Sequence, residues 1–391
     1  MRILYLCADH GVPVYGRRGC STHVREACRG LVAAGHDVTL VASNTDGDSP
    51  PVEGLRVVRV EPPRSRRMGY DLRNAWHNRA FYQAASDVAQ RDGIEAIYER
   101  LSLYGLAGTW LARRRGLPLV VEVNAFLSRE HARKLHFPAL ARAAERHVTR
   151  RASGCVVVSD PLRQELLAMG VEDRRITILP TAVDTGLFRP DEARRAETRR
   201  RLRIPDGRLV VGYVGGLASW HGVTVLHDAA RALAEAGMDA LVLVVGGESA
   251  EAACARAAAC EAGVGERMLF TGGVPYAEVP AMLDAMDVAV VPDTLEWTCP
   301  TKMFEYQASG LPSVAPRYPG VAQAMDDGRE GLLFAPRDWA AMTRAVVRLA
   351  GDAALRRSLG AAARARVEST HSWRRHAETV AGMFERMRDK G

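Results

Sequence analysis

Short runs of apolar residues recur along the chain, and segments with helical periodicity lie between them. Arg2–Cys7 is predicted to be a strand, and after it Val24, Cys28 and Leu31 are spaced like one face of a helix. Asp37–Ala42 begins the next strand–helix unit. The later predicted strands are Ala96–Tyr98, Leu117–Val123, Cys155–Val158, Leu209–Val214, Ala240–Val245, Met268–Thr271, Val288–Val291 and Ser313–Ala315. Strands that alternate with helices predict an α/β fold, in which helices cover both faces of a parallel sheet.

The alternation is interrupted between about residues 180 and 204, where the chain becomes polar and rich in arginine. It then restarts at Leu209–Val214. We therefore predict two doubly wound domains, residues 1–183 and 184–372. Such sheets bind ligands at the carboxyl ends of their strands. The amphipathic segment Trp373–Met387 predicts one further helix at the end of the chain.

Composition excludes several classes of protein. The chain has 391 residues, of which 47% are hydrophobic, and this supports two ordinary globular cores. No run of about 18 apolar residues predicts a membrane span, and the first strand reaches Asp9 too soon for a signal peptide. The seven cysteines are scattered without a Cys-x-x-Cys pair, so we expect reduced thiols, a cytoplasmic protein and no metal site.

The net charge of +7 is carried almost wholly by arginine, since the only lysines are Lys134, Lys302 and Lys390. Basic residues cluster at Arg64–Arg67 and along Arg129–Arg151. Neither cluster has the interleaved aromatic residues of a single-strand binder or a DNA-reading motif, so we expect no nucleic-acid partner. For the second cluster, a solvated helix face and a peripheral contact with a membrane both remain open.

The segment from Cys299 to Pro312 carries the strongest chemical pattern. Pro300 suits the first position of a helix, and Gly310 suits its end. Lys302 and Glu305 are three residues apart and share a face near the positive end of that helix. A helix N-terminus beside a lysine can receive a diphosphate, and a carboxylate about 5 Å further along can reach the hydroxyls of a ribose. The alternative is an incidental Lys–Glu pair on a surface helix.

This segment resembles the donor-binding helix of family-4 retaining glycosyltransferases, which reads Ser-Pro-Leu-Lys-Leu-Phe-Glu-Tyr-Met-Ala-x-Gly. Pro319-Gly320 and the turn Gly328–Gly331 follow in the same order as in that family. The resemblance covers nearly the whole chain and implies the GT-B architecture, with two Rossmann-like domains and a cleft between them. It also implies that the terminal helix, residues 373–391, packs back on the first domain. The donor-binding residues that it implies here are Pro300, Thr301, Lys302 and Glu305.

A second glycine-containing loop follows the strand Leu209–Val214. The two glycines Gly215 and Gly216 leave room for backbone N–H groups to approach a phosphate, although a tight turn is the alternative. The following Trp-His-Gly-Val sequence is similar to the same family, which implies that His221 contacts the donor. Many relatives have arginine and lysine where Gly216 and His221 stand. We therefore expect Lys302 to supply most of the positive charge, and packing of His221 beside its neighbouring tryptophan is the alternative.

The loop before the donor helix departs from the family pattern. Relatives often carry a glutamate eight residues before the helix glutamate, and Trp297 occupies that position here. Glu296 is the candidate replacement if the loop is shifted by one residue. The predicted catalytic residues are therefore Lys302, Glu296 and Asn124.

Residues of the first domain are candidates for the acceptor side of the cleft. Pro13–His23 resembles a flexible loop that faces the cleft in the family. Arg100 and Asn124 lie at or just after the ends of apolar strands. Glu122 lies within a strand, where an unpaired carboxylate is costly, and an ion pair with Arg100 is the structural alternative. The acceptor-side candidates are Gly16, Arg17, Gly19, His23, Arg100 and Asn124.

Taken together, the resemblance implies a metal-independent retaining hexosyltransferase. It moves a sugar from a nucleoside diphosphate, with UDP the first candidate and GDP the second, to a small-molecule acceptor in natural-product or cell-envelope biosynthesis. The nucleotide-sugar is a co-substrate, and we expect no cofactor. We expect a monomer or a homodimer. Two alternatives stay open: a nucleotide-sugar 2-epimerase with the same fold, and a catalytically inactive partner subunit.

Overall fold

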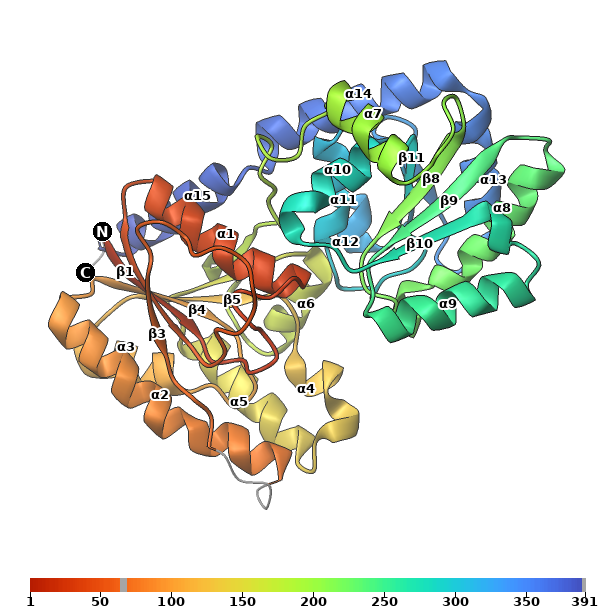
Figure 1. Cartoon of the computed structure of the whole chain (residues 1–391). Coiled ribbons are helices and arrows are strands. Elements are labelled where there is room, and N and C mark those ends of the chain that lie inside the picture. Colours follow the sequence, from red (N-terminus) through yellow and green to blue (C-terminus); the bar gives the residue numbers. More distant parts are fainter. Residues whose placement is uncertain (64–68, 389–391) are drawn as a thin grey trace. The chain divides into compact units, whose positions relative to one another are not determined.

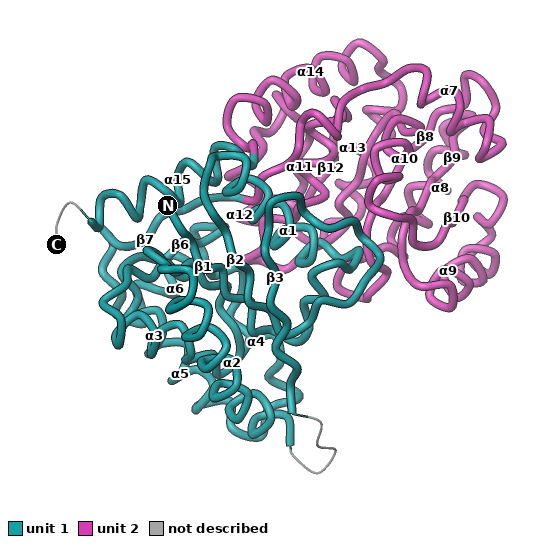
Figure 2. The backbone as a smooth tube through the Cα atoms, turned by 60° about the vertical axis from the view of Figure 1, so that its left-hand side comes forward, with its two compact units in different colours: residues 1–180, 373–391 teal, residues 181–372 magenta. Residues whose placement is uncertain are grey.

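The computed structural model describes residues 1–63 and 69–388 of the chain. The basic cluster Arg64–Arg67 therefore lies outside the described residues. The chain forms two compact units (Figure 2). Unit 1 comprises Met1–Pro180 and Trp373–Gly391, and unit 2 comprises Thr181–Ser372. The division between them lies three residues before the boundary at 183/184 that the sequence suggested.

Unit 1 contains a seven-stranded parallel sheet with the order β3-β2-β1-β4-β5-β6-β7 (Figure 1). Its strands are β1 Arg2–Cys7, β2 Asp37–Ala42, β3 Arg56–Arg59, β4 Ala96–Arg100, β5 Leu119–Val123, β6 Gly154–Val157 and β7 Ile176–Ile178. Its α-helices are α1 Gly19–Ala33, α2 Tyr70–Asp92, α3 Ala107–Arg115, α4 Leu127–Glu130, α5 Pro138–Arg151, α6 Asp160–Ala168 and α15 Trp373–Arg388. Helix α1 packs against α15, and α2 packs against α3.

Unit 2 contains a six-stranded parallel sheet with the order β10-β9-β8-β11-β12-β13. Its strands are β8 Leu209–Val214, β9 Ala240–Val245, β10 Met268–Gly272, β11 Val288–Val290, β12 Ser313–Pro316 and β13 Gly331–Phe334. Its α-helices are α7 Glu192–Arg201, α8 Leu226–Glu235, α9 Ser249–Glu261, α10 Val279–Asp284, α11 Thr301–Ala308, α12 Pro319–Ala322, α13 Trp339–Gly351 and α14 Ala353–Thr370.

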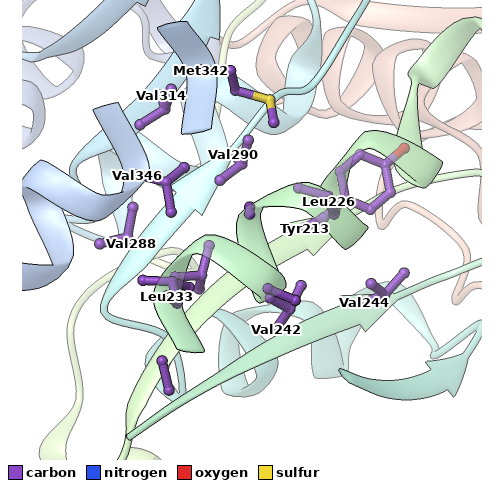
Figure 3. Packing of buried hydrophobic residues seen from close by; sticks show 14 of the residues in the cluster. Tyr213, Leu226, Leu233, Val242, Val244, Val288, Val290, Val314, Met342 and Val346 are labelled. Atoms are coloured by element: carbon purple, nitrogen blue, oxygen red, sulfur yellow. The ribbon is translucent and has the colours of Figure 1, made fainter. Parts of the chain in front are cut away.

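The core of unit 2 forms where α8 and α13 cover one face of its sheet. The two helices contact each other as well as the sheet. Figure 3 shows the packing of Val242, Val244, Val288, Val290, Leu226, Leu233, Met342 and Val346. These side chains come from strands and helices that are distant in sequence, so the core ties the unit together from β8 to α13.

The sequence did not predict β3, β7 and β13, and all three lie at an edge of a sheet. Strand β3 has two half-buried valines between exposed arginines, and all three residues of β7 are only half-buried. A central strand of a parallel sheet is covered on both faces and therefore reads as a continuous apolar run. Strands β3 and β7 lack that pattern, which explains why they were missed, whereas β13 is mostly buried but offers an apolar run of only three residues after Gly331.

Helix α15 completes the core of unit 1. Its apolar residues join the cluster formed by β1, β2 and α1; they are Ala377, Val380, Met383 and Phe384. Gly30 of α1 makes this contact close, because a Cβ atom there would lie 2.7 Å from the backbone oxygen of Trp373. Among the described residues, no helix combines the length and the apolar character needed to cross a membrane.

Replacing Gly30 with alanine is expected to destabilise unit 1. The new methyl group would push against backbone, and overpacking of this kind costs about 1–3 kcal/mol, which outweighs the gain in helix propensity of about 1 kcal/mol. Urea denaturation should therefore show a net loss of stability for Gly30→Ala. Gly382→Ala in α15 is the matched control, because its Cβ would meet only the end of the flexible Arg386 side chain, at 3.4 Å. Equal stability of the two variants would contradict the packing described here.

Candidate active site

The helix α11 brings the predicted donor residues together in unit 2. It begins at Thr301, and Pro300 is its N-cap residue, with φ −70° and ψ 127°. The prediction that Pro300 occupies the first helical position is therefore wrong by one residue. Proline tolerates both positions because it lacks the N–H that a helix start leaves unpaired. Lys302 and Glu305 remain on the helix, three residues apart.

The ammonium group of Lys302 lies against the end of β8. Its Nζ donates a hydrogen bond of 2.9 Å to Tyr213 Oη and lies 4.2 Å from the centroid of the Tyr213 ring. Tyr213 Oη in turn donates to the carbonyl oxygen of Gly216, at 2.6 Å. The tyrosine therefore connects the lysine to the glycine loop, and the ring face adds a cation–π attraction.

The backbone conformation and the position of this lysine both favour glycine at position 215. Gly215 has φ +148°, and a Cβ atom there would lie 2.4 Å from Lys302 Nζ and 2.8 Å from Tyr213 Oη. Gly246, after β9, is equally constrained, since its Cβ would lie 2.0 Å from the Gly215 oxygen. Gly216 would meet His221 only at an ordinary 3.7 Å, so the contact there does not demand glycine.

Burial shifts the pKa values of the two charged groups of α11 toward neutral pH. It lowers the pKa of Lys302 to about 7, against the opposing charge of Glu305. It raises the pKa of the Glu305 carboxyl to about 7, against a hydrogen bond from Tyr276 and the charge of Lys302. Burial and the nearby Lys302 also lower the pKa of His221 to about 3, so this imidazole is neutral near pH 7. Lys302 is thus the only one of the predicted donor-side residues that can carry positive charge at that pH.

The loop between β11 and α11 holds Glu296 in an exposed position. Glu296 forms no hydrogen bond or ion pair within the described part of the chain. Asp293, which the sequence did not single out, is the better-anchored carboxylate of this loop. Its N–H donates to His221 O at 3.2 Å, and its Oδ1 accepts from Tyr318 Oη at 3.3 Å. Its position just after β11 was the available signal.

The structure corrects the predicted loop of the first domain. Gly19 and His23 belong to α1, so they are not loop residues. His23 is 3% exposed, and its side chain is hydrogen-bonded to Glu122 in the interior of unit 1. Gly16 and Arg17 do lie before the helix, where Arg17 forms an ion pair with Asp48.

Glu122 finds a different partner from the one expected. The structure shows no salt bridge between Glu122 and Arg100 among the described residues; Glu122 pairs with His23 and accepts from Tyr5 Oη at 3.2 Å. Although burial opposes ionisation, the pKa of Glu122 falls to about 2, chiefly through His23 and then through His376 and Arg100. Arg100 therefore lowers the pKa of this carboxylate by electrostatic attraction, without a salt bridge to it.

Arg100 and Asn124 present unused hydrogen-bond donors at neighbouring strand ends. Arg100 ends β4, and Asn124 follows β5, which pairs with β4 in parallel. Arg100 Nη1 and Asn124 Nδ2 are both buried without a hydrogen-bond partner in the structure. Unpartnered buried donors of this kind call for an explanation, and a bound ligand is one.

One cluster in unit 1 has the side chains of a metal site, although the sequence showed no such cluster. The ligand atoms of His23, Glu122 and His376 lie within 4.8 Å of one another. They come from α1, β5 and α15, and this wide separation in the sequence hid them. Because Glu122 is hydrogen-bonded to His23, and Tyr98 Oη lies 3.2 Å from His376 Nε2, we interpret the cluster as a hydrogen-bonded network.

Two family models match this chain. The model described as "Glycosyltransferase Family 4" matches residues 17–187, and the one described as "Glycosyl transferases group 1" matches residues 208–352. The 2-deoxystreptamine glucosyltransferase of Streptomyces kanamyceticus is 32% identical over 64% of this chain and 65% of its own length. The D-inositol 3-phosphate glycosyltransferase of Acidothermus cellulolyticus is 30% identical over 97% of this chain and 86% of its own length.

Solved structures share the whole fold. The sucrose-phosphate synthase of Thermosynechococcus elongatus aligns with a TM-score of 0.81 at 22% identity, covering 100% of both chains. The Anabaena protein HepE, solved in complex with UDP, aligns with a TM-score of 0.77 at 18% identity, covering 98% of this chain and 100% of its own. At these identities the likeness concerns the fold alone, and it confirms the predicted GT-B class.

The lowered pKa of Lys302 can be measured directly, because the chain contains only three lysines. Competitive acylation with trace acetic anhydride, followed by mass spectrometry, should give Lys302 a titration midpoint of about 7. Glu305→Gln should move this midpoint lower, since the Glu305 charge raises the pKa of Lys302. Glu235→Gln on the exposed side of α8 is the control and should leave it unchanged. A midpoint above about pH 9, close to the ordinary lysine value, would contradict the described burial.

Proposed function

This chain belongs to the family-4 glycosyltransferases, and we propose that it transfers a hexosyl group from a nucleoside diphosphate–sugar to a small-molecule acceptor with retention of configuration. Sugar transfer follows from membership of the family. The nucleotide, the stereochemical course and the acceptor are the proposed parts.

The observation that carries the proposal is the arrangement of Lys302 and Glu305 on α11 beside the Gly215 loop. Lys302 supplies positive charge at the start of the helix, where unpaired backbone N–H groups also favour an anion. Glu305 is buried one turn further along, where its carboxylate can accept from two ribose hydroxyls. A nucleoside diphosphate has these two parts at a matching separation.

The proposed chemistry places the stabilising groups at the leaving diphosphate. The bond from the anomeric carbon to the phosphate oxygen breaks, and the bond to the acceptor oxygen forms on the same face. The proton of the acceptor hydroxyl passes to an oxygen of the leaving diphosphate, so the step requires no side-chain base. Negative charge grows on the diphosphate as its bond breaks, and Lys302 and the α11 N–H groups stabilise it there.

The names of the relatives support the choice of substrates. UDP is the first candidate because HepE was solved with UDP. GDP is the second, since a relative from Mycolicibacterium smegmatis is named as a GDP-mannose-dependent mannosyltransferase. The small molecules 2-deoxystreptamine and D-inositol 3-phosphate appear in the names of two relatives, which favours a small polar acceptor. We assign Arg100 Nη1 and Asn124 Nδ2 to binding such an acceptor, because both donors are unpartnered.

Calorimetry against UDP, GDP, ADP and dTDP tests this assignment. We expect one nucleotide to bind preferentially, and Glu305→Gln to weaken its binding by about 1–3 kcal/mol, the range for a hydrogen bond to a charged group. Because burial raises the pKa of Glu305 to about 7, the affinity should also fall as the pH drops below that value. Glu235→Gln serves as the control. Unchanged affinity in a folded Glu305→Gln variant would show that Glu305 does not hold the ribose.

Lys302→Ala is expected to lower kcat by about 10²-fold or more, while nucleotide affinity falls less. The lysine acts on charge that develops only in the transition state, so its loss should affect turnover more than binding. Lys302→Arg should recover activity in part, because a guanidinium has a different shape. Lys134→Ala is the control, and kcat is measured near donor saturation.

Two results would contradict this role of Lys302. In the first, Lys302→Ala turns over at the wild-type rate and only KM rises, so that the lysine serves binding alone. In the second, turnover is lost in EDTA and restored by Mg²⁺ or Mn²⁺. We propose that no divalent ion takes part, and activity should therefore survive exhaustive EDTA treatment.

A further inference from the structure

Unit 1 carries an exposed apolar surface at the start of α2 and of α5. Leu72, Trp76, Phe137 and Leu140 have exposed fractions of 56%, 62%, 62% and 60%. We call these four residues the apolar patch. They account for most of the large hydrophobic residues that are exposed in the described part of the chain. Exposed apolar residues gathered on neighbouring elements mark an interaction site more often than scattered single residues do.

A buried carboxylate holds the two parts of the patch together. Asp71 accepts hydrogen bonds from Tyr104 Oη at 2.5 Å and from the backbone N–H groups of His136 and Phe137, at 2.9 and 3.3 Å. These bonds outweigh burial and lower the pKa of Asp71 to about 2. Leu72 directly follows Asp71, and Phe137 is itself bonded to Asp71 through its N–H. The patch is therefore formed in the folded unit without any partner.

The second set of contacts fixes the segment between α4 and α5. Tyr70 Oη lies 2.8 Å from His131 Nδ1. The guanidinium of Arg73 lies 5.8 Å from the centroid of the Tyr70 ring and helps to hold that ring in place. Figure 1 shows the start of α2 beside α4 and α5, at one end of unit 1. The patch thus projects from a fixed corner of the unit.

Basic residues surround this corner. Arg79 on α2 and Arg133 and Lys134 before α5 are exposed. None of the three forms a salt bridge within residues 1–63 and 69–388. From residue 129 to residue 151 the sequence has seven arginines and lysines against two glutamates, of which Glu145 is buried and hydrogen-bonded to Ser128. The surface is therefore apolar at its centre and positive around it.

We propose that the apolar patch docks on the surface of an anionic lipid bilayer. Tryptophan and phenylalanine enter the level of the headgroups, and the surrounding cations contact lipid phosphates, which is the usual combination for interfacial binding. A second copy of the chain fits less well, because docking patch on patch would bring the surrounding positive charges together, whereas anionic headgroups complement them. The proposal concerns lipid binding alone and does not depend on the proposed sugar transfer.

Co-sedimentation of the full chain with vesicles tests the proposal. We expect binding to phosphatidylcholine vesicles that contain about 30% phosphatidylglycerol, weakening with added salt, and little binding to phosphatidylcholine alone. The triple variant Trp76→Ser, Phe137→Ser, Leu140→Ser should lower the partition coefficient by at least about tenfold. Arg133→Gln with Lys134→Gln should lower it by about fivefold for each charge removed. Binding is read without donor or acceptor, so its outcome is separate from that of the activity assays.

Trp110→Ser is the matched control. Trp110 is 43% exposed on α3 and contacts the Tyr82 ring edge-to-face, outside the patch. Its loss should leave vesicle binding unchanged, and thermal melting should show that all variants fold. The proposal is overturned if the wild-type chain does not bind anionic vesicles, or if Trp110→Ser weakens binding as much as the triple variant. It is equally overturned if the patch residues instead drive self-association in sedimentation velocity without lipid.

Discussion

A lysine ammonium held against backbone is the constraint on which the candidate site depends. Lys302 Nζ occupies the space in which a side chain at position 215 would lie, and the φ of +148° also favours glycine at this first residue after β8. Tyr213 pairs with the lysine, and Tyr306 of α11 accepts from the Val214 N–H at 2.8 Å. The helix and the end of β8 are thus joined by two tyrosine hydroxyls, which fixes the charge of the site relative to its loops.

The central elements of both sheets could be predicted from sequence because each strand is covered on both faces. The donor helix was also predictable, since Lys302 and Glu305 lie close in sequence and their spacing sets their geometry. The loop assignment of His23 failed because the helix that starts at Gly19 has no side-chain cap at its N-terminus, so the sequence lacked the usual signal of a helix start. Asp293 was missed for a different reason, since its partners lie on other loops.

Long-range contacts explain the remaining differences in unit 1. The expected partner of Glu122 was Arg100, because both lie near the ends of neighbouring strands, whereas the actual partner His23 lies on α1. His376 adds to the same network from α15, where Tyr98 Oη lies 3.2 Å from its Nε2. Residues separated by 99 and 278 positions cannot be paired from one sequence by spacing rules. Buried polar groups must find partners, but the sequence does not say which.

The placement of α15 has a consequence for how the protein is made. Unit 2 is inserted into unit 1, since residues 181–372 separate the seven strands of unit 1 from the helix that completes its core. During synthesis, the ribosome releases the whole of unit 2 before Ala377, Val380 and Phe384 emerge. Unit 2 can therefore fold while unit 1 still exposes the apolar face of α1. The apolar face of α1 therefore stays open to aggregation in the nascent chain until α15 arrives to cover it.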